Sequence, residues 1–189
     1  MEENLKSRLN EGETVLWQSK TEPIQALDKT NKKRFLTNLI VCSVIAAVLI
    51  GLYLGFVKGE VKISAIVLVL LLCAFAPLRR ILDASAVKKL QYLVTDQRLL
   101  VSNGSELKGV ELGRIRDAVL KQDADGHLSL LVGSHGIKTK PDHWRELAIV
   151  GQPSSLPEEE PIETFGFYAV EDRAGLKKVL AQVLPLVKS

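Results

Sequence analysis

Three histidines are the residues of this sequence best suited to metal binding or acid–base chemistry. They are His127, His135 and His143, each eight residues from the next. Histidines that share a metal usually follow a closer H-x3–5-H spacing. Ser134 precedes His135, but a catalytic serine meets its histidine through the fold and not as a chain neighbour. We therefore expect no catalytic residues and no metal site, and we predict that the protein is not an enzyme.

An acidic turn at Asp123, Asp125 and Gly126 is similar to part of a calcium-binding loop. When Gly126 is aligned with the sixth position of such a loop, Lys121 takes the first position and Val132 the twelfth. Neither side chain supplies a carboxylate, so the calcium interpretation fails. The sequence also lacks a glycine-rich phosphate loop, and we expect no cofactor.

Two long apolar stretches, Phe35–Val57 and Ile63–Leu78, contain no Asp, Glu, Lys, Arg or His. An α-helix crosses a hydrocarbon core of about 30 Å with about 20 residues. The first stretch has that length, and the second reaches it with flanking residues that snorkel to the interface. A buried core helix would be polar on one face, but residues 66–72 are apolar on every face. The sequence thus predicts an α-helical transmembrane hairpin over 35–82, whose second span is 61–78.

Basic residues flank this hairpin on its outer sides, and we call them the basic collar. They are Lys32, Lys33, Arg34, Arg79, Arg80, Lys88 and Lys89. The short connector carries only Lys58 and Lys62, with Glu60 between them. By the positive-inside rule, we expect a two-pass protein of the cell inner (cytoplasmic) membrane with both termini cytoplasmic. The collar sets this topology in our interpretation; the alternative is that it recognises anionic lipid headgroups. Because the basic residues concentrate beside the bilayer, we expect no nucleic-acid partner.

The first span contains a stripe of small residues that recur every fourth position. We call it the small-residue stripe, and its members are Ser43, Ala47, Gly51 and Gly55. Small residues allow the backbones of membrane helices to approach closely, and the last two form a GxxxG pair. We expect the stripe to pack against the second helix of the hairpin. The alternative is packing against the same helix in a second copy of the chain.

The two cysteines, Cys42 and Cys73, lie one in each span. We expect them to be small, reduced packing residues rather than a disulfide. Transport through the hairpin is poorly supported, because an ion or proton path usually needs polar or ionisable groups inside the membrane. The polar residues Thr37 and Asn38 lie near one end of the first span.

A soluble α+β domain is expected over residues 91–189, joined to the hairpin by a helical stalk over 83–90. The preceding segment, 1–34, contains a possible short helix with Leu5 and Leu9, and a short strand at Thr14–Gln18. In the domain the alternating patterns predict strands, at Gln91–Val94, Arg98–Ser102, Arg116–Gln122, His127–Val132 and Leu147–Val150.

Two hairpin turns and a C-terminal helix complete the expected domain. Asn103-Gly104 and Asp125-Gly126 predict hairpins with type I′ turns, which need positive φ at both central residues. A polar loop is expected over 151–161. Asp172 is a good N-cap for an amphipathic helix over 172–187, which Pro185 should end or bend.

Three blocks of the chain resemble the bacterial pleckstrin-homology-like (PH-like) domain of membrane proteins. The blocks are LNEGETVLWQSKTEP (Leu9–Pro23), YLVTDQRLLVSNG (Tyr92–Gly104) and VELGRIRDAVLKQDADGHLSLLVG (Val110–Gly133). Two membrane spans between the first and second blocks are also common in that family. The resemblance implies a bent antiparallel β-sandwich or barrel capped by a C-terminal helix. It assigns fold-forming roles to Tyr92, Thr95, Asp96, Arg98 and Gly104. Thr95 and Asp96 would stabilise the turn by hydrogen bonds to the backbone.

The resemblance implies a fold more strongly than a function, since the bacterial branch shares no defined ligand. Our first hypothesis is a non-enzymatic, membrane-anchored module that binds another protein or copies of itself at the cytoplasmic face, in envelope maintenance or stress response. The second is a lipid-headgroup sensor that uses the basic collar and the domain charges Lys108, Arg114 and Arg116. The third is an accessory subunit of a membrane transporter or enzyme. The bilayer itself is the expected lipid partner in all three.

Overall fold

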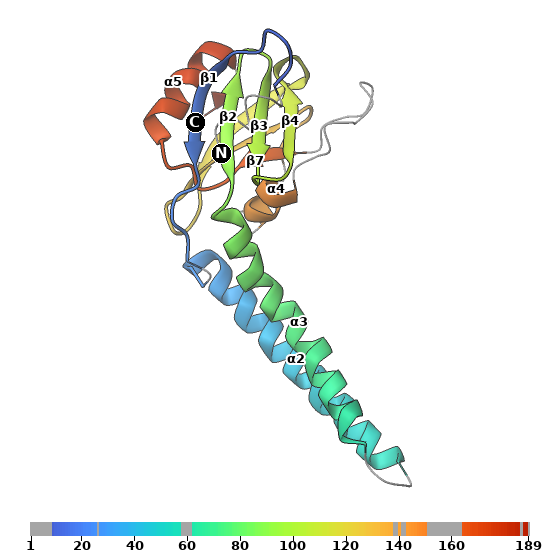
Figure 1. The fold of residues 1–189 in the computed structure, drawn as a ribbon. Coiled ribbons are helices and arrows are strands. Elements are labelled where there is room, and N and C mark those ends of the chain that lie inside the picture. The colour runs from blue at the N-terminus through green and yellow to red at the C-terminus, as the bar shows by residue number, and fades with distance from the viewer. Residues whose placement is uncertain are drawn as a thin grey trace.

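The computed structural model describes residues 9–25, 27–57, 62–137, 140, 143–150, 164–185 and 187–188. Two long helices project side by side from a domain of two β-sheets (Figure 1). The expected short helix with Leu5, the connector 58–61 and the polar loop 151–161 lie outside the described residues.

Helix α2 (Lys29–Phe56) and helix α3 (Ile63–Val87) form the hairpin. Helix α2 begins before the apolar stretch, because the side chain of Asp28 caps its first turn by accepting the N–H of Asn31. Helix α3 runs continuously through Pro77 and includes most of the expected stalk. The backbone N–H of Lys62 donates to the hydroxyl of Tyr53 at 3.0 Å, so the two helices also meet at the far end.

Nearly all of the apolar surface of both helices is exposed. In each helix only 6% of an apolar 18-residue segment is buried inside the protein. Phe56 is 81% exposed and Leu72 is 67% exposed. A core helix would instead bury such residues. By length and composition both helices are able to cross a membrane.

The small-residue stripe does not pack within the hairpin, so that expectation is wrong. Ala46 is buried against the neighbouring helix, and Cys42 and Ile50 beside it are half-buried. All four stripe residues are exposed, and a Cβ added at Gly51 or Gly55 would meet no atom within 4 Å. The reason is helix geometry: the stripe is offset by one residue, about 100°, from the line that contacts α3.

The first sheet joins segments from both sides of the hairpin. Its order is β1 (Val15–Lys20), β2 (Gln91–Thr95), β3 (Arg98–Ser102) and β4 (Leu107–Glu111). Strand β1 pairs antiparallel with β2, from Val15 beside Thr95 to Lys20 beside Gln91. The expected strands here are confirmed, but β1 is an integral edge strand of the domain and not part of a separate N-terminal segment.

The second sheet packs behind the first. Its order is β7 (Phe165–Phe167), β6 (Leu128–Gly133), β5 (Asp117–Gln122) and β8 (Val187–Lys188). The pairs are antiparallel except for β5 with β8, which are parallel. The short 3-10 helix η1 (Leu112–Arg114) leads the chain from one sheet to the other.

An apolar core fills the space between the sheets and under helix α5 (Arg173–Val183). Tyr92 stacks on Phe167 with ring centroids 4.8 Å apart. Leu176 of α5 is buried in the same core. Asp172 caps α5 as expected, but the helix ends at Val183 and not at 187. Proline lacks the N–H that a helix interior needs, so Pro185 is excluded and the chain continues into β8.

One expected strand is a helix. Residues Leu147–Val150 belong to α4 (Trp144–Val150), on which Trp144 and Ala148, four residues apart, are both buried. A short apolar run fits either a strand or a buried helix, and periodicity over four residues does not separate the two.

Both hairpin turns occur where expected, but neither is of type I′. Gly104 and Gly126 have positive φ, 91° and 84°, whereas Asn103 and Asp125 do not. The loops between the paired strands are longer than two residues. In the first loop the side chain of Asn103 accepts two backbone N–H groups, at 3.0 and 2.7 Å. Asp123 does the same in the other loop at 2.9 Å. These side-chain bonds replace the second positive-φ residue.

A substitution at Gly166 tests the packing of β7 against β6. A Cβ at Gly166 would lie 2.9 Å from the carbonyl oxygen of Leu130, which is backbone and unable to move aside cheaply. We expect Gly166→Ala to lower the free energy of unfolding by about 1–3 kcal/mol. The matched control Gly113→Ala should change it little, because a Cβ there meets nothing within 4 Å. Thermal unfolding followed by tryptophan fluorescence measures this, since Trp17 and Trp144 both lie in the domain core. Equal stability of the two variants would contradict the packing.

Candidate functional site

The two motif blocks around the hairpin meet at the end of the first sheet that is remote from α2 and α3. Glu13 accepts hydrogen bonds from the Thr95 hydroxyl at 2.7 Å and from Arg98 at 3.0 and 2.5 Å. Asp96 accepts the backbone N–H of Thr14 at 3.0 Å. The Thr95 hydroxyl also accepts the N–H of Arg98 at 2.8 Å, which closes the turn. These residues therefore hold β1 to the β2–β3 turn.

The Glu13 carboxylate is strongly stabilised in its ionised form. Burial opposes ionisation, but hydrogen bonds from Arg98, the N–H of Asn10 and Thr95, together with the charge of Arg98, lower the pKa of Glu13 to about 2. Its side chain has no exposed area. Such a carboxylate is an anchor for the fold and not a proton carrier near neutral pH.

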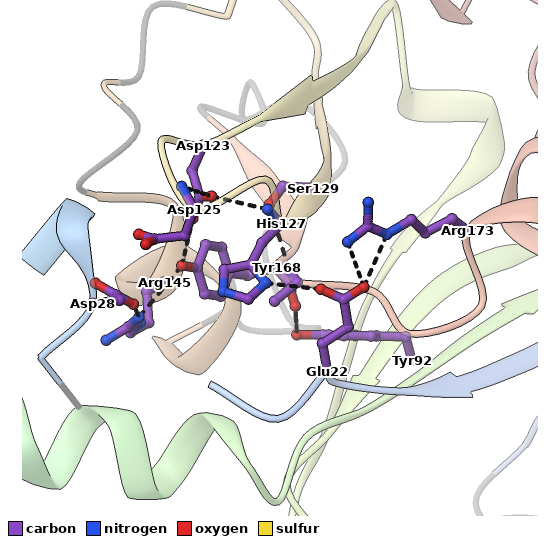
Figure 2. A network of polar contacts seen from close by, with 11 residues as sticks. Glu22, Asp28, Tyr92, Asp123, Asp125, His127, Ser129, Arg145, Tyr168 and Arg173 are labelled. Atoms are coloured by element: carbon purple, nitrogen blue, oxygen red, sulfur yellow. Dashed lines mark hydrogen bonds and ion pairs between the residues drawn. The ribbon is translucent and has the colours of Figure 1, made fainter. Parts of the chain in front are cut away.

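A second polar network lies at the opposite end of the domain, where the hairpin begins (Figure 2). Arg145 of α4 donates to Asp28, the N-cap of α2, and both side chains are only 5% exposed. Arg145 also donates to the Tyr168 hydroxyl at 3.4 Å. That hydroxyl donates to Asp123 in the β5–β6 loop at 2.8 Å. Four elements are thus joined through one buried guanidinium.

Burial shapes the ionisation of this network. It raises the pKa of Tyr168 despite the opposing charge of Arg145, so the phenol remains a proton donor to Asp123. Burial disfavours the charge of Arg145, but Tyr168 and Asp28 outweigh it and raise the pKa of Arg145. Breaking a buried ion pair by removing one partner typically costs about 3–5 kcal/mol, because the other charge is left uncompensated. The network is therefore a strong constraint on how α2 leaves the domain.

Two further contacts reinforce this junction. The backbone N–H of Lys29 donates to Asp125 at 3.1 Å. Glu22 pairs with His127 at 2.8 Å and accepts two hydrogen bonds from Arg173 at 2.9 and 2.6 Å (Figure 2). The segment between β1 and α2 is thereby held to the β5–β6 loop and to α5.

Tyr92 connects the junction to the core. Its hydroxyl donates to the carbonyl of Tyr168 at 2.7 Å and accepts the N–H of the same residue at 3.2 Å. Burial raises the pKa of Tyr92 to about 12, so it stays neutral. The structure thus gives Tyr92 a fold-forming position between the two sheets.

The histidines are not brought together. His127 contacts Glu22, as described above. His135 contacts Ser134 at 3.2 Å on the surface, and His143 contacts Glu146 at 3.0 Å. Within the parts of the chain that the structure describes, no group of three or more His, Cys, Asp or Glu side chains is placed to hold a metal. The two cysteines are free.

The basic collar lies on the hairpin beside the domain. Lys32, Lys33 and Arg34 are in the first two turns of α2, residues 79 and 80 are in α3, and residues 88 and 89 follow its last turn. Arg34 also approaches Glu146 of α4 at 3.9 Å, with both side chains about one-third exposed. Such an exposed pair contributes little to stability.

Two of the three domain charges, Arg114 and Arg116, do not form one surface with the collar. The N–H of Leu112 donates to the carbonyl of Gln97, which places η1 at the end of the sheet remote from α3. Arg114 belongs to η1 and Arg116 follows it. A strand of five residues separates this end from the hairpin by about 16 Å. Lys108, on β4 opposite Val101, lies nearer the hairpin end, beside Leu90 and α4.

Sequence reasoning missed the residues that connect the hairpin to the domain. Asp28 carries a recognisable signal, because an aspartate directly before a helix is a preferred N-cap. Arg145 carries none, since it stands beside a run that predicts a strand. Tyr168 and Glu22 belong to short segments without periodicity, and only the fold brings them to the same place.

Acid should weaken the Glu13 anchor. The pKa of Glu13 is lower in the folded chain than its ordinary 4.5, so its stabilising contribution is complete above pH 4.5 and is lost as the pH falls toward 2. We expect the wild type to lose about 3 kcal/mol more than Glu13→Gln between about pH 5 and pH 2. Unfolding followed by tryptophan fluorescence at several pH values measures the difference. Glu11→Gln, at an exposed position two residues earlier, should behave like the wild type. Identical pH profiles for Glu13→Gln and the wild type would contradict this assignment.

Comparison with known proteins finds no match for this chain among protein-family models, curated proteins or solved structures. A function therefore has to follow from the residues and contacts of this chain itself.

Proposed function

We propose that this chain is a two-pass membrane protein whose two ends lie on the same, cytoplasmic, side. The exposed apolar surface of α2 and α3 supports insertion into a bilayer. Strand β1 precedes the hairpin and β2 follows it, yet they pair in one sheet, which supports placing both ends of the hairpin on one side of the membrane. The basic collar lies at that end, which favours the cytoplasmic face.

We further propose that the domain is a non-enzymatic, PH-like interaction module. Two four-stranded sheets and one C-terminal helix are compatible with that fold. The contact of Glu13 with Thr95 and Arg98 gives two of the three motif blocks a common physical role, which is to close the first sheet. A module of this kind fits a role in envelope maintenance or stress response.

The observation that carries the proposal is the outward orientation of the small-residue stripe. The stripe residues are exposed, and they do not pack against α3. In a bilayer, helices associate where small residues allow close backbone contact. A second copy of the chain presents the same stripe, so self-assembly through α2 is the interaction that we propose first.

A lipid-headgroup sensor is the second candidate, and the position of the basic collar favours it. Exposed lysines and arginines beside a bilayer each gain about 1 kcal/mol from anionic headgroups. Arg114 and Arg116 lie at the end of the domain remote from the hairpin. Their distance from the hairpin exceeds the roughly 8 Å beyond which salt largely screens the attraction between exposed charges. Headgroup binding would therefore use the collar and not these two residues. An accessory subunit of a transporter or enzyme remains a third proposal, which predicts loss of the partner's activity on deletion of this chain.

Cysteine labelling in intact cells tests the proposed topology. In a chain carrying Cys42→Ala and Cys73→Ala, we expect Lys62→Cys to react with a membrane-impermeant thiol reagent from outside. Lys20→Cys and Lys177→Cys, on exposed positions of β1 and α5, should react only after permeabilisation. Labelling of the two domain positions on opposite sides would refute both the topology and the pairing of β1 with β2.

Enlarging the stripe tests self-assembly. We expect Gly51→Ile with Gly55→Ile to reduce crosslinked dimer severalfold in the native membrane, because the side chains hold the backbones apart. Neither substitution should disturb the hairpin, since a Cβ at either position meets nothing within 4 Å. Val67→Ile with Leu71→Ile, on exposed positions of α3, is the matched control and should keep wild-type crosslinking. Undiminished dimer in the glycine variant would contradict self-assembly through the small-residue stripe.

A further inference from the structure

The two helices of the hairpin are held to the domain by different contacts, although α2 follows β1 and α3 leads into β2 of the same sheet. Helix α3 leads through Leu90, which is buried, directly into β2 of the first sheet. The N-terminus of α2 is held instead by Arg145 and by Asp125 of the β5–β6 loop, which belong to the second-sheet side of the domain. Movement of α2 along α3 would therefore act on α4 and on the β5–β6 loop.

Helix α4 is the element that both helices contact. Arg145 binds the N-cap of α2, Glu146 approaches Arg34 of α2, and α3 also packs on α4. Helix α4 in turn packs on β7 of the second sheet. A change in the arrangement of the hairpin thus acts directly on α4.

The two helices have apolar stretches of unequal length. The charge-free stretch of the first span, residues 35–57, measures about 34 Å as a helix. That of the second span, residues 63–78, measures about 24 Å. A typical hydrocarbon core of about 30 Å matches neither length. Bilayers of different thickness therefore favour different tilts or displacements for α2 and α3.

The contact between Asp28 and Arg145 is incompletely satisfied. Arg145 uses its Nη2 for both of its hydrogen bonds, and its buried Nε–H has no partner among the residues that the structure describes. A buried donor without a partner disfavours the closed arrangement relative to one in which water reaches the guanidinium. The pair therefore holds α2, and the unpaired Nε–H lowers the free-energy cost of breaking the contact.

From these observations we propose that the Asp28–Arg145 pair transmits changes in bilayer thickness from α2 to α4 and the second sheet. This inference rests on the proposed insertion of both helices in a membrane. In a thin bilayer the longer apolar stretch of α2 has to tilt or move outward, which pulls Asp28 against Arg145. Helix α4 and the β5–β6 loop then loosen, while β2 and β3, which follow α3, stay paired.

Hydrogen exchange of the full-length chain in lipid nanodiscs tests the proposal. We expect backbone amides of α4 and of residues 123–127 to exchange severalfold faster in dimyristoleoyl- than in dioleoyl-phosphatidylcholine. Amides of β2 and β3 should exchange equally in both lipids and serve as the internal reference. Equal exchange of α4 in the two lipids would overturn the proposal.

Asp28→Asn is the decisive variant. Asparagine caps a helix as well as aspartate does, so α2 keeps its first turn while the ion pair is lost. We expect fast exchange in α4 in both lipids and loss of the difference between them. If β2 and β3 also lose protection, Asp28→Asn with Arg145→Met replaces the single variant, because it leaves no buried charge uncompensated. Persistence of the wild-type lipid difference without the pair would overturn the proposal.

Arg34→Gln is the matched control, since it removes the exposed contact of α2 with Glu146 and leaves the buried pair in place. It should keep the full lipid dependence. Loss of that dependence in Arg34→Gln would assign the coupling to the exposed contact instead. Co-elution of the chain with lipid is checked before exchange begins. Failure to enter the nanodisc refutes the membrane assignment, whereas entry without a lipid response refutes only the coupling.

Discussion

The antiparallel pairing of β1 with β2 is the contact on which the rest of this structure depends. It joins the segment before the hairpin to the segment after it, in register from Val15–Thr95 to Lys20–Gln91. The sheet closes only when α2 and α3 return the chain to the place from which it left. The hairpin and the domain therefore fold together, and the pairing of the two strands fixes which ends of α2 and α3 lie beside the sheet.

Polar anchors stabilise this arrangement at both ends of the sandwich. At the remote end, the ionised Glu13 side chain holds the β2–β3 turn through Thr95 and Arg98. At the hairpin end, Arg145 holds Asp28. Both anchors are largely covered from water, where removing one partner costs far more than at a surface. The apolar core between them supplies the non-directional part of the stability, and the anchors decide which segments meet.

The exposed surfaces of the molecule divide by distance from the hairpin. The basic collar and α4 lie beside the proposed membrane surface, whereas Arg114 and Arg116 lie a strand length away. The small-residue stripe faces outward from α2 along its apolar length. In the topology that we propose, each surface faces a different environment: headgroups for the collar, lipid or a second helix for the stripe, and the cytoplasm for the remote end.

Periodic and compositional features were predictable from the sequence, because each acts over a few neighbouring residues. The apolar helices, the paired strands, the hairpin positions and the cap at Asp172 are of this kind. The orientation of the small-residue stripe was not predictable, because it depends on which side of α2 meets α3. The helical state of Leu147–Val150 and the strand at Val187 were also decided by packing, since a short run has no strong local preference.

The same holds for the site. Thr95, Asp96 and Arg98 were visible as a motif, but their contacts with Glu13 and Thr14 span more than 80 residues. The amino-acid sequence by itself determined the local elements and the apolar lengths of the hairpin. Only the tertiary structure decided that Asp28, Arg145, Tyr168 and Asp123 form one network, because buried charges are tolerated solely where distant segments bring their partners together.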